Sequence, residues 1–141
     1  MTSIAETMRG DASAHTVLVV DDDESVRELM AYVLESEGYN VFRARHSRDA
    51  LFLHSEFAGT VHLLLTDICM KPHDDGFTLA RALRRDRPDM KVIFASGYVD
   101  QNLLRSEMLE APARFLAKPF TPAALIECVR NALAVEAPAA A

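Results

Sequence analysis

Residues 16–23 read TVLVVDDD, an apolar run that ends in three aspartates. An apolar run without alternating polar residues is typical of a strand that is buried on both faces. From about Glu24 the pattern changes, and apolar residues recur every three or four positions, as on one face of a helix. Gly38 follows this stretch and is placed to end the helix, because glycine readily adopts the left-handed conformation. The stretch therefore predicts a buried strand followed by an amphipathic helix.

The same strand-and-helix unit recurs along the chain. Strand-like segments lie at residues 39–44, 61–65, 91–95 and 114–117, and helical patterns begin near Ser47, Phe77, Leu103 and Pro122. Ser47 and Thr121 are the expected N-caps of the second and last helices. Five such units predict a parallel sheet with helices on both faces. The segments 17–20, 61–65 and 91–95 are the most apolar and suit central positions, whereas the other two carry polar residues typical of edges. This predicts an α/β, flavodoxin-like, doubly wound (βα)5 sheet with strand order 2-1-3-4-5.

Composition limits the kinds of protein this can be. A chain of 141 residues, half of them hydrophobic, suits one domain, expected at residues 16–135 with flexible tails at 1–15 and 136–141. The net charge of −6 argues against nucleic-acid binding through a basic surface. Two cysteines make no disulfide framework, and no apolar run reaches the roughly 18–20 residues of a membrane span. A cytoplasmic protein without membrane contact is therefore expected.

Chemically active residues stand where four of the expected strands end. Asp21 and Asp22 follow the first strand, Asp67 the third, Ser96 the fourth and Lys118 the fifth. Because parallel strands end at one edge of a sheet, these side chains should converge. Packed carboxylates repel one another and favour a hard cation such as Mg²⁺. A carboxylate nucleophile, a metal ion, a lysine and a hydroxyl are together the requirements for phosphoryl transfer to an aspartate.

Four segments, VLVVDDDE, LLLTDICM, FASGY and FLAKPF, resemble the signature segments of response regulator receiver domains, in the same order along the chain. The resemblance implies that Asp67 is the phosphoacceptor and that Ser96 and Lys118 assist the transfer. It also implies a Mg²⁺ site at Asp21, Asp22, Asp67 and the backbone carbonyl of Cys69, with Asp22 as a direct ligand. Ser96 and Phe115 would be the switch residues.

The resemblance also implies partners. A histidine kinase or histidine phosphotransfer protein would donate the phosphoryl group. The face made by the fourth helix, fifth strand and fifth helix would then engage a downstream protein or a second copy of the chain. The only reactions catalysed would be the protein's own phosphorylation and dephosphorylation. No output domain is expected after residue 135, and the short tails favour a free-standing regulator over a fragment of a hybrid kinase.

Two observations leave room for other interpretations. Receivers commonly read D-x-x-M-P-x-M-D-G after the acceptor, but here the Asp75-Gly76 pair arrives one residue late, which predicts an altered loop. Asp21 and Asp23 also resemble the D-x-D start of haloacid-dehalogenase-type phosphatases, with Asp21 as nucleophile and Asp23 as general acid. That class requires a further acidic pair late in the chain, which is missing here, and it gives Asp67 no role. A pseudo-receiver is disfavoured by the complete acceptor set.

Overall fold

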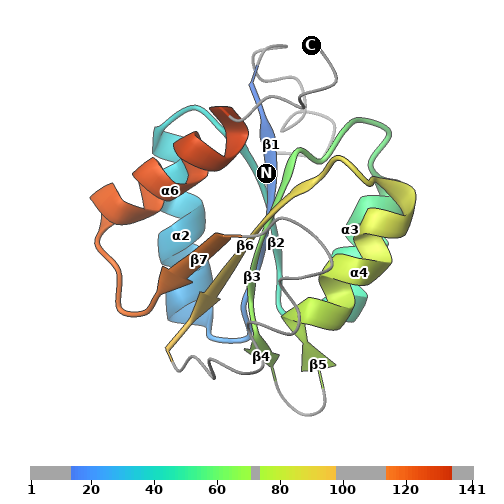
Figure 1. Cartoon of the computed structure of the whole chain (residues 1–141), viewed down its shortest axis with the longest axis horizontal. Helices are drawn as coiled ribbons and strands as arrows, with labels where there is room; N and C mark the ends of the chain where they lie inside the picture. The colour runs from blue at the N-terminus through green and yellow to red at the C-terminus, as the bar shows by residue number, and fades with distance from the viewer. Residues whose placement is uncertain (1–13, 71–73, 98–113, 135–141) are drawn as a thin grey trace.

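A five-stranded parallel sheet forms the centre of the computed structural model, which describes residues 14–70, 74–97 and 114–134. The strands lie in the order β2-β1-β3-β6-β7, and each pairs in parallel with its neighbours (Figure 1). Their bounds are β1 (Thr16–Val20), β2 (Asn40–Ala44), β3 (Leu63–Asp67), β6 (Lys91–Ser96) and β7 (Arg114–Ala117). The predicted flavodoxin-like order, with the two polar strands at the edges, is confirmed.

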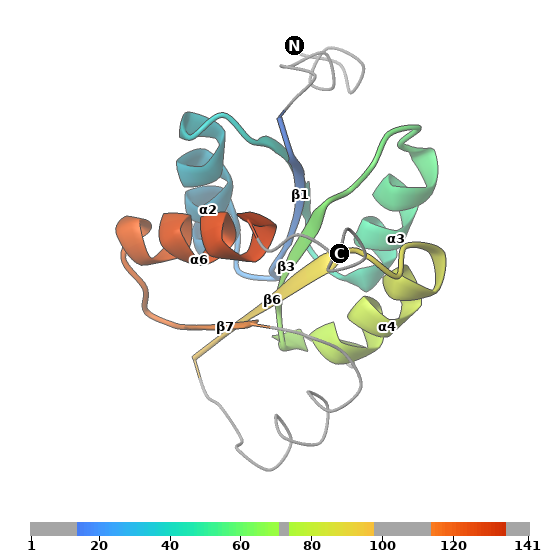
Figure 2. The same ribbon diagram turned by 45° about the horizontal axis from the view of Figure 1, so that its top comes forward.

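Helices cover both faces of the sheet (Figures 1 and 2). On one face lie α2 (Glu24–Ser36) and α6 (Pro122–Ala134), and on the other lie α3 (Ser47–Glu56) and α4 (Gly76–Asp86). Successive residues of β1 alternate between two apolar clusters, one holding Val17 and Val19 and the other Leu18 and Val20. All four are fully buried, which explains the uninterrupted apolar run of this strand.

The ends of the helices are set by local hydrogen bonds. The Asp23 carboxylate accepts the first free N–H groups of α2, and Gly38 adopts a φ of 95° after its last turn. The Thr121 hydroxyl accepts an N–H at the start of α6, as predicted. The prediction that Ser47 caps α3 is wrong, because Ser47 is the first residue of that helix. The cap is His46, and the Ser47 N–H donates instead to the Asp74 carboxylate at 2.7 Å.

A short ribbon follows the third strand of the sheet. β4 (Cys69–Met70) and β5 (Asp74–Asp75) pair in antiparallel fashion on either side of residues 71–73. Several predictions lie outside the described residues. These are the fourth helix, most of the N-terminal tail, all of the C-terminal tail, and Tyr98 of the FASGY segment. Among the described residues, no helix is long and apolar enough to cross a membrane.

Candidate functional site

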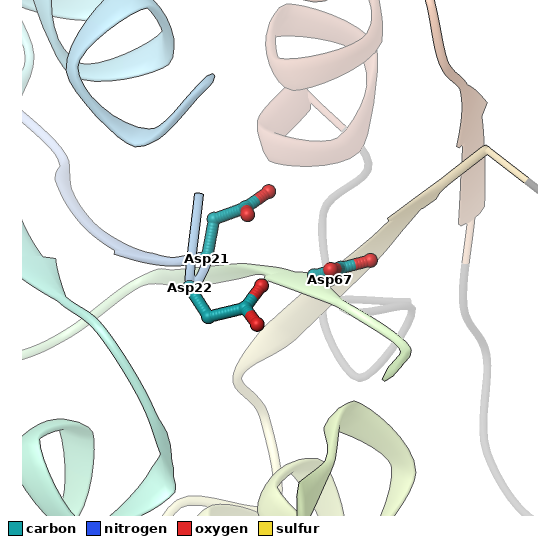
Figure 3. A group of neighbouring side chains, drawn as sticks. All are labelled: Asp21, Asp22 and Asp67. Atoms are coloured by element: carbon teal, nitrogen blue, oxygen red, sulfur yellow. The ribbon is translucent and has the colours of Figure 1, made fainter. Parts of the chain in front are cut away.

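Three aspartates meet at the carboxyl edge of the sheet. Asp21 and Asp22 directly follow β1, and Asp67 is the last residue of β3, which pairs with β1. One carboxylate oxygen from each lies within 4.8 Å of the others, and Figure 3 shows the three side chains on these adjacent segments. The three aspartates that were predicted to converge at the ends of these strands therefore do lie close together.

Each polar group of Asp21, in the backbone and in the side chain, makes a hydrogen bond. Its side chain is fully buried, with Oδ1 accepting the Asp23 N–H at 2.9 Å and Oδ2 accepting Lys118 Nζ at 2.7 Å. Its N–H donates to the carbonyl oxygen of Ala44 at 3.1 Å, and its own carbonyl accepts Arg27 Nη1 at 3.0 Å. These bonds fix the point at which the chain leaves β1.

Lys118 places its ammonium between two of the carboxylates. Its Nζ lies 2.7 Å from Asp21 Oδ2 and 3.6 Å from Asp67 Oδ1, and its side chain is 19% exposed. The lysine follows β7 and is joined to Pro119 by a cis peptide bond. One positive charge thus faces two buried acids, with the shorter distance to Asp21.

Asp67 is difficult to ionise in this environment. Burial raises the pKa of Asp67 from 3.8 to about 6, and the negative charges of Asp21 and Asp22 add to the rise. The charge of Lys118 and the N–H of Ile68, which donates to Asp67 Oδ1 at 2.9 Å, act in the opposite direction but do not cancel it. The carboxylates outnumber the cation, so a hard divalent ion with oxygen ligands fits this group.

The other predicted residues lie around the acidic group. Ser96 ends β6 and is buried, and its carbonyl accepts the Lys118 N–H at 2.9 Å. Cys69 is exposed and lines a pocket of about 390 Å³ together with Asp22, Asp23 and Met70. Phe115 lies farther away on β7, half-buried, with its ring 5.5 Å from that of Phe94. Phe115 thus packs against the strand that ends at Ser96.

Asp23 has a different task from its two neighbours. Its Oδ1 accepts the N–H groups of Ser25 at 2.9 Å and Val26 at 3.2 Å, so it caps α2. In a haloacid-dehalogenase-type phosphatase this residue would be the general acid. Here the Asp23 carboxylate is instead engaged at the start of α2, where it accepts two backbone N–H groups. The geometry therefore favours the receiver interpretation, in which Asp67 is the reactive acid.

Two residues near the site were not singled out from the sequence. Gly76 begins α4 and donates its N–H to the Ile68 carbonyl at 2.8 Å, and a Cβ at this position would lie 2.2 Å from the Asp67 carbonyl oxygen. Arg27 is buried beside Asp21. Both had a signal: Gly76 belongs to the displaced Asp-Gly pair, and Arg27 interrupts the apolar stripe of its helix.

The late Asp-Gly pair is accommodated by the ribbon of β4 and β5. Asp74 accepts both the N–H and the hydroxyl of Ser47, at 2.7 and 2.5 Å, which ties the ribbon to the start of α3. Asp75 caps α4 by accepting the N–H of Thr78 at 2.8 Å. Gly76 can therefore pack against the end of β3 even though the segment before it is longer than usual.

The comparisons with known proteins agree with this geometry. The family model described as the response regulator receiver domain matches residues 17–130. The sensor kinase CckA of Brucella abortus is 39% identical over 118 residues. The aligned region covers 84% of this chain but only 12% of the length of the kinase. The receiver protein CpdR of the same species is 34% identical over 74% of this chain and 84% of CpdR. The crystal structure of the receiver domain of the hybrid histidine kinase CckA has a TM-score of 0.70 at 34% identity, covering 84% of this chain and 98% of that domain. The chain belongs to the response regulator receiver domain family of two-component signalling.

Proposed function

We propose that Asp67 accepts a phosphoryl group from a phosphohistidine of a histidine kinase or of a histidine phosphotransfer protein. An Asp67 carboxylate oxygen attacks the phosphorus, the P–N bond breaks, and the released imidazole nitrogen takes up a proton. The observation that carries this proposal is the position of Asp67, at a strand end beside both the acidic pair and Lys118. The protein would act as a signalling phosphoacceptor that catalyses only its own phosphorylation and dephosphorylation.

The surrounding residues have distinct proposed roles. Receivers generally bind Mg²⁺ at an acidic group of this kind, and here Asp21, Asp22, Asp67 and the backbone carbonyl of Cys69 would hold it. When bound, Mg²⁺ supplies positive charge that stabilises the phosphoryl oxygens. Lys118, whose Nζ lies 3.6 Å from Asp67 Oδ1, would supply a second positive charge.

The switch is proposed to run from Ser96 to Phe115. Phosphorylation gives Asp67 about −1.5 to −2 charges and new acceptor oxygens, to which the Ser96 hydroxyl can donate. Movement of Ser96 changes the end of β6, and Phe115 packs on Phe94 of that strand. The altered face would comprise β7, α6 and the helix expected within residues 98–113. This face would bind a downstream protein or a second copy of the chain in a phosphorylation-dependent dimer.

Acetyl phosphate tests the acceptor. We expect the intact mass of the wild-type protein to increase by one phosphoryl group in Mg²⁺ and not in EDTA, and Asp67→Asn to abolish the adduct. Glu56→Gln, which removes a negative charge from an exposed position on α3, is the control and should be phosphorylated normally. An equal adduct on Asp67→Asn, lost only in Asp21→Asn, would instead support the phosphatase interpretation.

Amide NMR tests the switch. Beryllofluoride, a phosphoryl mimic, should shift amides around Asp67 and also those around Phe115. Phenylalanine has no hydroxyl, so coupling at this position must rest on packing. Shifts that stay within the acidic group, with none near Phe115, would show that the signal takes another route. The domain limits of 16–135 and the cytoplasmic location stay predictions, which limited proteolysis and cell fractionation can check.

A further inference from the structure

Arg27 carries a charge where a charge is costly. It lies in the first turn of α2, is 8% exposed, and shares the buried face of this helix with Met30, Ala31 and Leu34. Burial removes the guanidinium from water, and a cation near a helix N-terminus opposes the helix dipole. Both effects disfavour Arg27 unless its contacts compensate for them.

The contacts of Arg27 lead to the acidic group. Its Nη1 donates to the carbonyl oxygen of Asp21 at 3.0 Å, and its guanidinium lies 3.9 Å from the Glu24 carboxylate and 3.6 Å from that of Glu28. The two glutamates offset part of the charge, but an exposed arginine could pair with them equally well. Only the bond to Asp21 requires the buried position, and it is made at the peptide that joins Asp21 to Asp22.

We propose that Arg27 is a positioning residue that fixes the Asp21–Asp22 peptide and thereby holds the Asp22 carboxylate against Asp67 for Mg²⁺ binding. The orientation of this peptide sets the direction in which the chain leaves β1 and carries Asp22. Without Arg27, a buried carbonyl loses its side-chain donor, and one restraint on the orientation of this peptide is removed. This inference rests on the proposed magnesium site and adds a residue that does not touch the ion.

A magnesium titration measures the effect directly. The full chain is labelled with ¹⁵N, and the dissociation constant follows from amide shifts at residues 22 and 67. We expect Arg27→Gln to raise the Kd on the order of 10-fold, as is typical when an outer residue that orients a metal ligand is removed. Arg27→Lys keeps a donor and the charge and should recover part of the affinity. Thermal unfolding without Mg²⁺ measures the structural cost separately.

Arg43→Gln is the matched control. Arg43 on β2 is partly exposed and pairs with Glu28 at 3.0 Å and with Glu35 at 2.8 Å, so its loss changes the net charge equally without touching the Asp21 carbonyl. It should keep the wild-type Kd. An equal loss of affinity in Arg43→Gln would mean that charge alone matters, and would overturn the proposal.

A wild-type Kd in folded Arg27→Gln would also overturn it. Arg27→Met keeps the apolar stem and replaces Arg27→Gln if that variant does not fold. If the wild-type protein shows no response to Mg²⁺, the metal site itself is wrong and the role of Arg27 is overturned with it. If the wild-type protein binds Mg²⁺ and the Arg27 variants have the same Kd, only the positioning role fails.

Discussion

Replacing Asp67, the proposed phosphoacceptor, with asparagine should make the protein more stable when Mg²⁺ is absent. Asp67 is 9% exposed and faces the negative charges of Asp21 and Asp22. Asp67→Asn keeps the shape of the side chain and an oxygen that can accept the Ile68 N–H, but removes the buried charge. Lys118 keeps its shorter contact, to Asp21 at 2.7 Å. The substitution therefore relieves repulsion without leaving the lysine unpaired.

The size and the pH range of this effect follow from the pKa of Asp67. A rise from 3.8 to about 6 disfavours the ionised form in the folded state by about 3 kcal/mol, since a tenfold change in an equilibrium corresponds to about 1.4 kcal/mol. The folded protein binds this proton more tightly than the unfolded chain, so wild-type stability falls as the pH rises from about 4 to about 6. Below pH 3.8 the penalty is absent, and above pH 6 it is complete.

Urea unfolding at several pH values measures the difference. At pH 7.5 in EDTA, the free energy of unfolding of Asp67→Asn should exceed that of the wild type by up to about 3 kcal/mol. This corresponds to a Tm increase of about 10 °C. The difference should shrink towards zero near pH 4, and Mg²⁺ should narrow it at pH 7.5 because the ion stabilises only the form that binds it. Glu56→Gln should change stability by less than about 0.5 kcal/mol. An Asp67→Asn protein that is no more stable than the wild type at pH 7.5 would refute the buried-charge argument.

Two further predictions concern the start of α4, where it packs on β3, and the opposite end of the sheet. Gly76→Ala places a methyl group 2.2 Å from the Asp67 carbonyl oxygen, so urea unfolding should show a loss of at least about 2 kcal/mol. Gly97→Ala, whose nearest contact is an ordinary 3.9 Å, should cost far less, and similar losses would contradict the steric reason. The pKa of His62 is lowered from 6.5 by burial, and its Nδ1 accepts the Thr16 N–H at 2.9 Å. The stability contributed by neutral His62 is present above pH 6.5 and is lost as the pH falls through the lowered pKa. His62→Asn can accept the same N–H without titrating, so this variant should lose less stability on acidification.

The arrangement of the sheet could be predicted because burial in this fold leaves a direct mark on the sequence. A strand covered by helices on both faces must be apolar throughout, as Val17 and Leu18 are, and edge strands are free of that requirement. The meeting of Asp21 with Asp67 could be predicted for a similar reason. Parallel strands end at one edge, and the strand order alone makes these two residues neighbours.

The bonds that hold the site in place could not be predicted in this way, because they depend on how the elements pack against one another and not on local sequence pattern. Ser47 looks like a helix cap from its neighbours alone, yet its N–H and hydroxyl are taken by Asp74, 27 residues later. Local pattern cannot show this, since the contact exists only after α3 and β5 have been brought together by the fold. Arg27 shows the same limit: its place on an apolar stripe marks it as unusual, but only the structure shows that it reaches the carbonyl of Asp21. The strand ends thus predict which charged groups meet, whereas the bonds that hold those groups in place become visible only in the folded chain.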